Sequence, residues 1–367
     1  VKESLCQWPV NFASRPSSAL KVEAVSRYHP PFTICKFSRS LSSIMAIPII
    51  DLSSLANRTP TLEETTAVRK ACLDFGFFYV INHGIPGDLQ AKVLEKLWKF
   101  FSLSAEKKEE IHRRDGFRGY FRKQEERSIE YNCTEWKEGI YYFRDFKNLP
   151  EEKKEKIFCG LNPWPKGEYV PEFRAVIDEY FRRTQELASN LLSCIALSLG
   201  LERDFFIKEF TDDPFAQLAM FHYPPNPFSK DGHEIWGAGR HTDYGMLTIL
   251  LQDDVGGLQV ETKDGVWIEV PPISGSFVVN LGDMMEIWTS GALRAGPHRV
   301  KVSPTEHRLS VAMFYEPGFD CMISPIPLDK TLIPVEKTAA KLRMDFPIRY
   351  GDYVLKKFCS ILPADKP

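Results

Sequence analysis

The spacing of hydrophobic and polar positions divides the chain into an N-terminal part with helical periodicity and a later part built of short strand-like runs. Residues 113–170 follow neither period, are rich in aromatic and charged residues, and are expected to form a long lid-like segment. The other elements predicted before position 211 are two strands and four helices: Ile47–Asp51, Thr61–Phe75, Phe77–Ile81, Gly87–Phe101, Ala105–His112 and Pro171–Gly200.

After about Gln217 the pattern changes to short β-type runs separated by Pro, Gly and Asp turns. The runs are QLAMFHY, MLTILL, GLQVE, WIEV, SFVVNL, HRVKV and LSVAMFYE. Such a series predicts an antiparallel barrel, so the fold class is mainly β with helical additions around a double-stranded β-helix (jelly-roll) core. The expected organisation is an N-terminal helical region at 45–210, the core at 211–330, and at 331–367 a helix near Val335–Arg349 followed by a tail.

Residues 1–44 differ in composition from the remainder and are expected to lie outside the fold. They are rich in Ser and Pro, contain only Glu3 and Glu23 as acids, and show no sustained periodicity. Two interpretations stay open: an organelle-targeting transit sequence, or a disordered, non-native leader that precedes a true start at Met45.

Charge and cysteine usage narrow the class of protein. The 47 basic and 49 acidic residues are interspersed, which predicts neither a nucleic-acid nor a membrane partner. The eight cysteines form no CxxC pair, which favours a reducing compartment and hence the cytoplasm unless residues 1–44 direct the chain to an organelle. The oligomeric state is not determined by these features.

A candidate metal site is carried by the triplet His241-Thr-Asp243. On a strand, side chains two positions apart project from the same face, so both could reach one ion. His298 begins a later β-type run and could approach them in a barrel. Two imidazoles and one carboxylate are the facial triad of non-haem Fe(II) oxygenases, whereas structural zinc requires four protein ligands. In a chain with eight histidines the triplet alone would be weak evidence.

A second set of residues offers a binding site for a carboxylate. Arg308 and Ser310 lie on the β-type run after His298, and an arginine that points into a barrel needs an anion as partner. A guanidinium fork with a hydroxyl suits a carboxylate, and Tyr223 on an earlier run could add a phenolic donor. The alternative for Arg308 is a surface ion pair.

From about Ile47 to the C-terminal helix, the sequence resembles the isopenicillin-N-synthase-like family of Fe(II)- and 2-oxoglutarate-dependent oxygenases. The motifs that carry the resemblance occur in the family's order: IPIID at 47–51, DFGFFYVINHGIP at 74–86, HTD at 241–243, GGLQV at 256–260, NLGD at 280–283, PHRV at 297–300 and RLS at 308–310. The resemblance implies that His241, Asp243 and His298 hold iron, and that Arg308 and Ser310, assisted by Tyr223, bind the distal carboxylate of 2-oxoglutarate.

The same resemblance implies a reaction of dioxygen with a small-molecule substrate. The substrate is hydroxylated or desaturated, 2-oxoglutarate yields succinate and carbon dioxide, and ascorbate supports the iron. In a few family members the Arg-x-Ser pair holds a different carboxylate. An iron-dependent oxidase that does not use 2-oxoglutarate is therefore one alternative, and a non-catalytic binding or sensing protein on the same barrel is another.

The substrate is less well defined by the sequence. Phe314 shares the face of Arg308 on a regular strand and is a candidate for the pocket wall, with core packing as the alternative. The segment 119–127 (GYFRKQEER) resembles that of plant guanidino-acid hydroxylases and the bacterial ethylene-forming enzyme, in which an acid at the position of Glu126 meets a guanidinium. Ala219 departs from that pattern, and a solvated charge cluster is the simpler interpretation of Glu125 and Glu126.

Overall fold

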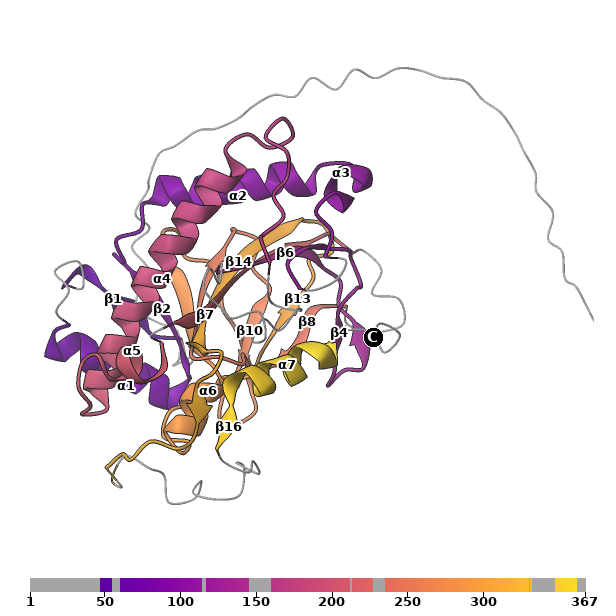
Figure 1. Cartoon of the computed structure of the whole chain (residues 1–367). Coiled ribbons are helices and arrows are strands. Elements are labelled where there is room, and N and C mark those ends of the chain that lie inside the picture. The colour runs from indigo at the N-terminus through magenta and orange to yellow at the C-terminus, as the bar shows by residue number, and fades with distance from the viewer. Residues whose placement is uncertain are drawn as a thin grey trace, which may run out of the picture. The chain divides into compact units, whose positions relative to one another are not determined.

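Figure 1 shows the computed structural model of the protein. Two β-sheets carry most of the residues that the sequence suggests for the metal and carboxylate sites. The structure describes residues 47–54, 60–113, 117–144, 160–211, 213–226, 235–329, 331 and 347–361. All of them belong to one compact unit that spans Met45–Pro367. The predictions made for residues 1–44 lie outside the described residues.

The larger sheet has eight strands, and the smaller sheet has four. In the larger sheet only the first two strands are parallel. The smaller sheet is antiparallel throughout. The spatial order of the larger sheet is β1 (Ile49–Asp51), β2 (Phe77–Ile81), β12 (Phe277–Leu281), β9 (Leu247–Gln252), β14 (Arg308–Gly318), β7 (Pro214–Tyr223), β6 (Glu138–Phe143) and β3 (Gly119–Phe121). That of the smaller sheet is β11 (Trp267–Glu269), β10 (Leu258–Glu261), β13 (His298–Lys301) and β8 (Trp236–His241).

The helices of the N-terminal part pack against the larger sheet. The longest, α4, contacts α1, α2 and α5 as well as strands β9 and β14 (Figure 1). A capping box between Thr61 and Glu64 begins α1, and the helix follows the range that the sequence predicts. Every residue of β7 is buried: the strand lies between β14 and β6, His222 stacks on Phe101 of α2, and Gln217, Phe221 and Tyr223 line the pocket on the other face. The helices are α1 (Leu62–Asp74), α2 (Gly87–Phe101), α3 (Ala105–Glu109), α4 (Phe173–Ser198), α5 (Phe205–Phe210), α6 (Asp283–Trp288) and α7 (Tyr350–Ile361).

The segment 113–170, expected to be irregular and lid-like, contains several strands among its described residues. Its described residues include β3 and β6, which extend the larger sheet beyond β7, and the hairpin of β4 (Arg127–Ser128) and β5 (Cys133–Thr134). The aromatic residues of this segment explain the difference: the run EGIYYF of β6 is buried at every position and pairs with β7. Part of this segment is therefore sheet, and several of its residues line the pocket.

The C-terminal helix also differs from the prediction. Residues 335–346 lie outside the described part, and Ile348–Arg349 form a short strand, β16, that pairs with β15 (Met322–Ile323). The described helix, α7, begins only at Tyr350, and it buries an apolar face that includes Tyr353, Val354 and Phe358. In the described part of the chain, none of the helices has the length and apolar character needed to cross a membrane.

Candidate metal centre and substrate pocket

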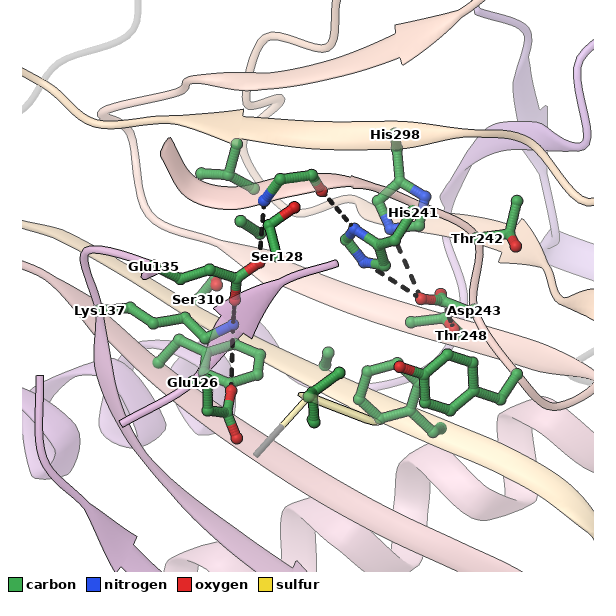
Figure 2. Close-up of a pocket in the computed structure, with 18 of the residues that line it drawn as sticks. Glu126, Ser128, Glu135, Lys137, His241, Thr242, Asp243, Thr248, His298 and Ser310 are labelled. Carbon is green, nitrogen blue, oxygen red and sulfur yellow. Dashed lines mark hydrogen bonds and ion pairs between the residues drawn. The ribbon is translucent and has the colours of Figure 1, made fainter. Parts of the chain in front are cut away.

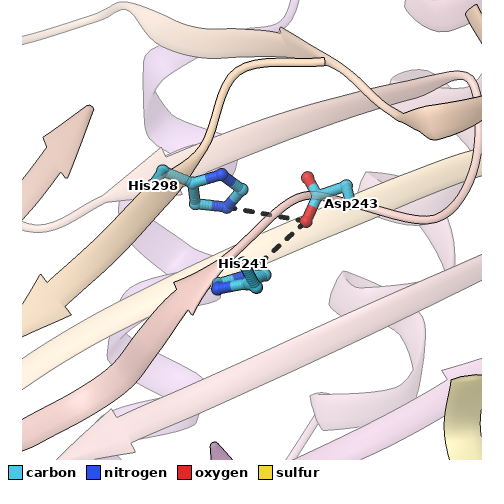
Figure 3. Close-up of side chains that lie close together, drawn as sticks. All are labelled: His241, Asp243 and His298. Atoms are coloured by element: carbon cyan, nitrogen blue, oxygen red, sulfur yellow. Dashed lines mark ion pairs between the residues drawn. The ribbon is translucent and has the colours of Figure 1, made fainter. Parts of the chain in front are cut away.

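The side chains of His241, Asp243 and His298 converge on one point (Figure 3), and their potential ligand atoms all lie within 4.8 Å of one another. Oδ1 of Asp243 is 3.5 Å from Nε2 of His298 and 3.7 Å from Nε2 of His241. The two histidines are direct partners in the pairing of β8 with β13. This register brings together residues that are far apart in the sequence.

Asp243 reaches the cluster in a different way from the one expected. His241 is the last residue of β8, so Asp243 lies in the connection to β9 and not on the same strand. Two hydrogen bonds hold its Oδ2 atom: Nδ2 of Asn280 donates at 2.6 Å, and the hydroxyl of Thr248 donates as well. Oδ1 is thereby left facing the two imidazoles, which is the arrangement that a metal ligand needs.

Backbone carbonyls fix the orientation of both imidazoles. Nδ1 of His241 lies 2.7 Å from the carbonyl oxygen of Gly239, and Nδ1 of His298 lies 3.1 Å from that of Gly296. A carbonyl oxygen can only accept, so each Nδ1 carries the proton and each Nε2 presents a lone pair toward Asp243. Metal-binding histidines commonly have such a hydrogen bond on the nitrogen that does not bind the metal.

The protonation states suit a cation. Burial and the neighbouring His241 lower the pKa of His298 to about 4, so its imidazole is neutral at neutral pH. Burial opposes ionisation of Asp243, but the two histidines and the hydrogen bonds from Thr248 and Asn280 outweigh it and lower its pKa. The cluster has three ligands among the described residues, fewer than structural zinc requires. Two imidazoles and a carboxylate fit Fe(II) with positions left for other ligands.

Arg308 lies in the same pocket and has unused hydrogen-bonding capacity. It is 1% exposed, and its Nη2 donates to Oε1 of Gln252 at 2.9 Å. Its Nε and Nη1 atoms have no hydrogen-bond partner among the residues that the structure describes. Because a buried guanidinium without an anion is costly, these two donors indicate a binding site for a carboxylate. The surface ion pair considered for Arg308 is excluded by its burial.

Ser310 and Tyr223 flank this arginine, as the sequence indicates. Ser310 is two positions further along β14 and is buried. Tyr223 pairs with Arg308 across β7 and β14, and its ring centroid lies 4.9 Å from the guanidinium carbon. Gly237 makes room for that ring, because a Cβ atom there would lie 2.4 Å from a carbon of Tyr223.

One pocket of about 400 Å³ collects these residues, and both sheets contribute to its wall (Figure 2). Each site residue that the sequence singled out lines this pocket: Glu126, Tyr223, His241, Asp243, His298, Arg308, Ser310 and Phe314.

Glu126 is not part of a solvated cluster, since it is only 2% exposed. Nη1 of Arg113 donates to its carboxylate at 2.9 Å, and Nζ of Lys137 lies 3.2 Å from it. Lys137 also binds Glu135, and Figure 2 shows Glu126, Lys137 and Glu135 joined in a row within the pocket. Burial alone would raise the pKa of Glu126, but the two cations lower it, so this carboxylate is ionised and already paired.

Comparison with known proteins gives the family. Residues 214–317 match the 2OG-Fe(II) oxygenase superfamily, and residues 47–167 match the family described as non-haem dioxygenase in morphine synthesis N-terminal. A probable iron/ascorbate oxidoreductase of Dictyostelium discoideum is 34% identical over 353 residues, which covers 88% of this chain and 96% of the relative. The chain belongs to the 2OG-Fe(II) oxygenase superfamily.

Other members of the 2OG-Fe(II) oxygenase superfamily support the assignment. A homoarginine-6-hydroxylase of Glycine max is 36% identical over 302 residues, covering 78% of this chain and 90% of the relative. The crystal structure of a full-length Neurospora crassa protein in complex with alpha-ketoglutarate (2-oxoglutarate) and thymine has a TM-score of 0.72 and 28% identity, with 86% of this chain and 96% of that chain covered. The protein is therefore a 2-oxoglutarate-dependent dioxygenase, and the predicted iron and 2-oxoglutarate are confirmed as its cofactor and co-substrate.

Several residues of this oxygenase's pocket escaped the sequence reasoning. Thr248 and Asn280 orient Asp243, although Asn280 belongs to the NLGD motif. Glu316 continues the alternation 308, 310, 312, 314 along β14, and Gln217 continues the alternation 223, 221, 219 along β7, so parity could have found both. Lys137 and Glu135 had no comparable signal, because they lie in the connection between β5 and β6 and these two strands were not predicted.

Proposed function

We propose that His241, Asp243 and His298 bind Fe(II), and that Arg308, Ser310 and Tyr223 bind the distal carboxylate of 2-oxoglutarate. The observation that carries the proposal is the buried guanidinium of Arg308, which retains two donors without partners in the pocket that also holds the three candidate ligands. The substrate in this proposal is a small organic molecule that is hydroxylated or desaturated. A cavity of about 400 Å³ has the size of such a site.

The residues of the chain have separate tasks in this proposal. Bound iron would supply the activation of dioxygen, with 2-oxoglutarate oxidised to succinate and carbon dioxide and with ascorbate as the supporting reductant. Arg308 fixes the co-substrate through charge-assisted hydrogen bonds, and Thr248 and Asn280 keep the Asp243 carboxylate aimed at the ion. Phe314 adds a hydrophobic part of the wall that helps to exclude water.

We propose further that the two sheets form a double-stranded β-helix, the jelly-roll core expected at 211–330. Residues of both sheets line the pocket. In both sheets, neighbouring strands come from distant parts of the chain, with the orders β12-β9-β14-β7 and β10-β13-β8, and this supports the assignment. The homoarginine hydroxylase and the Neurospora complex with thymine support a small substrate for this chain.

The metal assignment can be tested by anaerobic Fe(II) titration followed by metal analysis. The wild-type protein should take up one Fe(II) per chain, and His241→Ala and His298→Ala should lose it. His83→Gln is the matched control, because the His83 imidazole contacts Gly275 and Ile85 instead of the cluster. Equal iron uptake by the wild type and His241→Ala would refute the site.

A further inference from the structure

One face of strand β14 points into the pocket along most of its length. Its residues at positions 308, 310, 312, 314 and 316 all line the cavity, so Arg308 marks one end of the row and Glu316 the other. Glu316 lies eight positions after Arg308, or about 26 Å between Cα atoms at the usual rise of about 3.3 Å per residue. The pocket therefore has a cationic end and an acidic end.

The candidate metal centre lies between the two ends. Thr248, which hydrogen-bonds to Asp243, pairs with Phe314 across β9 and β14. Gln252, which binds Arg308, pairs with Ser310 closer to the cationic end. Glu316 lies on the far side of Phe314, beside Gly245, where a Cβ atom would be 2.4 Å from Cγ of Glu316. A molecule held at Glu316 would thus approach the centre from the side opposite Arg308.

Glu316 has no positive partner within the described part of the chain. It is 1% exposed, and its carboxyl accepts hydrogen bonds from the hydroxyl of Tyr350 at 2.6 Å and from Nε2 of Gln217 at 3.2 Å. Burial, with a smaller contribution from the Asp243 carboxylate, raises the pKa of Glu316 to about 8. Desolvation without a counter-charge is the cause.

Gln217 adds a second acceptor that lacks a donor. Its side chain is 3% exposed and lines the pocket, and its Oε1 atom has no hydrogen-bond partner among the described residues. A buried carbonyl oxygen without a donor has lost its hydrogen bonds to water and gained none in return. A ligand N–H group could supply the missing hydrogen bond. Glu316 and Gln217 therefore both present acceptors to the cavity.

Outside the candidate metal centre with Asp243, the other buried acidic side chains of the pocket already have cations. Glu126 and Glu135 share Lys137, and Glu126 also binds Arg113. The pocket's other lysine, Lys357, is bound to Asp283 at 3.2 Å. Outside the candidate metal centre, Glu316 is thus the buried pocket carboxyl of the described structure that lacks a cationic partner. This distinguishes it from Glu126, the acid that the sequence suggested for a guanidinium.

We propose that Glu316 and Gln217 anchor the substrate by binding a cationic nitrogen group, an ammonium or a guanidinium. This inference rests on the proposed function, since it places the nitrogen group on the side of the iron site opposite the 2-oxoglutarate carboxylate. Both acceptors gain a donor, and the carboxyl gains the counter-charge that the chain does not provide. The pocket then selects substrates by charge as well as by size.

The test measures binding of matched pairs of cationic and neutral compounds. The probes are lysine with norleucine, homoarginine with homocitrulline, and agmatine with N-carbamoylputrescine. Each is titrated calorimetrically into the full-length protein loaded with Fe(II) and 2-oxoglutarate under anaerobic conditions. The expected result is at least one pair in which the cation binds tenfold or more tightly than its neutral partner. The absence of that preference in all three pairs would overturn the proposal.

Variants locate the source of the preference. Glu316→Gln should reduce it to less than threefold, and Gln217→Met, which keeps the charge of the pocket, should weaken cation binding severalfold. Glu130→Gln is the matched control, because Glu130 lines the pocket but is exposed and paired with Arg240. Its preference should equal that of the wild type. A Glu316→Gln protein that folds, as judged by thermal unfolding, and keeps the full preference would refute the assignment.

A separate readout distinguishes this inference from the proposed function. Succinate release from 2-oxoglutarate in the absence of substrate reports on the iron and Arg308 sites alone. If the wild type turns over 2-oxoglutarate but shows no cation preference, the Glu316 inference fails and the function stands. If it neither binds iron nor turns over 2-oxoglutarate, the proposed function fails first.

Discussion

Gln252 holds Arg308 in place: Oε1 of Gln252 accepts a hydrogen bond of 2.9 Å from Nη2 of the guanidinium. The contact joins β9 to β14 and leaves Nε and Nη1 without partners in the described structure. The guanidinium is therefore oriented in advance for an anion, and a bound carboxylate would offset the part of its burial cost that the nearby Asp253 leaves uncompensated.

Replacement of Arg308 by methionine should abolish the increase in thermal stability that 2-oxoglutarate gives to the protein. In the absence of 2-oxoglutarate, Arg308→Met should unfold at the same temperature as the wild type or higher, because a buried cation without a bound anion is removed. Saturation with 2-oxoglutarate at 100 times its Kd should stabilise the wild type by about 2.7 kcal/mol and leave the variant unchanged. Thermal unfolding of the iron-loaded proteins measures both effects, and an equal gain in the variant would contradict the assigned role.

Loss of Asn280 should weaken iron binding although this residue is not a ligand in the proposed site. Asn280→Ala removes the hydrogen bond of 2.6 Å to Oδ2 of Asp243 and frees the carboxylate to rotate. The Kd for Fe(II) should rise by roughly 10- to 100-fold, the usual effect of removing a partner of a metal ligand. Anaerobic titration with a competing chelator gives the constant. An unchanged Kd would show that Thr248 alone orients Asp243.

The buried row of Glu126, Lys137 and Glu135 should respond strongly to loss of its cation. Lys137→Met leaves two buried carboxylates with less compensation and should lower the free energy of unfolding by about 3–5 kcal/mol. Lys92→Met is the matched control, because Lys92 and its partner Asp88 are both exposed, and it should cost less than about 1 kcal/mol. Urea denaturation measures both. Equal effects would mean that the buried row adds no more than a surface pair.

Glu316 should make the metal-free protein less stable as pH rises. Its pKa is about 8 in the folded chain against an ordinary value of 4.5, so the folded state binds the proton more tightly than the unfolded state. The stabilisation is complete below pH 4.5 and is lost between pH 4.5 and 8, by on the order of 1 kcal/mol per pH unit.

Glu316→Gln should remove the contribution of Glu316 to the pH dependence of the free energy of unfolding, and comparison of the variant with the wild type tests this. The variant should match the wild type near pH 5 and exceed its free energy of unfolding at pH 8. Denaturation at several pH values measures the difference, and a gap between the two proteins that does not grow with pH would contradict a raised pKa.

The residues that the sequence singled out for the chemistry lie together in one pocket of the structure. Strand alternation placed Arg308, Ser310 and Phe314 on one face, and the structure confirms that face. Histidine spacing suggested the metal cluster, although Asp243 lies beyond β8 and is held by Asn280 and Thr248 instead of by strand geometry. The pairing of His241 with His298 is a long-range contact that periodicity alone cannot specify.

The sequence was less informative about segments in which the hydrophobic and polar pattern does not reflect the burial of the folded chain. The segment 113–170 has an irregular mixture of charges and aromatics, yet its β6 strand is buried because β7 offers it an edge. Glu126, in the same segment, is also buried, and Arg113 and Lys137 compensate its charge. An ion-pair network of this kind depends on contacts that form only in the folded chain.

The consumption of labelled 2-oxoglutarate tests the central claim most directly. Wild-type protein supplied with Fe(II), ascorbate and dioxygen should release succinate and carbon dioxide in equal amounts, and the release should require iron. His298→Ala and Arg308→Met should each reduce the rate at subsaturating 2-oxoglutarate by at least tenfold. Release that is unaffected by either variant, or iron-loaded wild-type protein that forms no succinate with or without a broad substrate panel, would contradict the account.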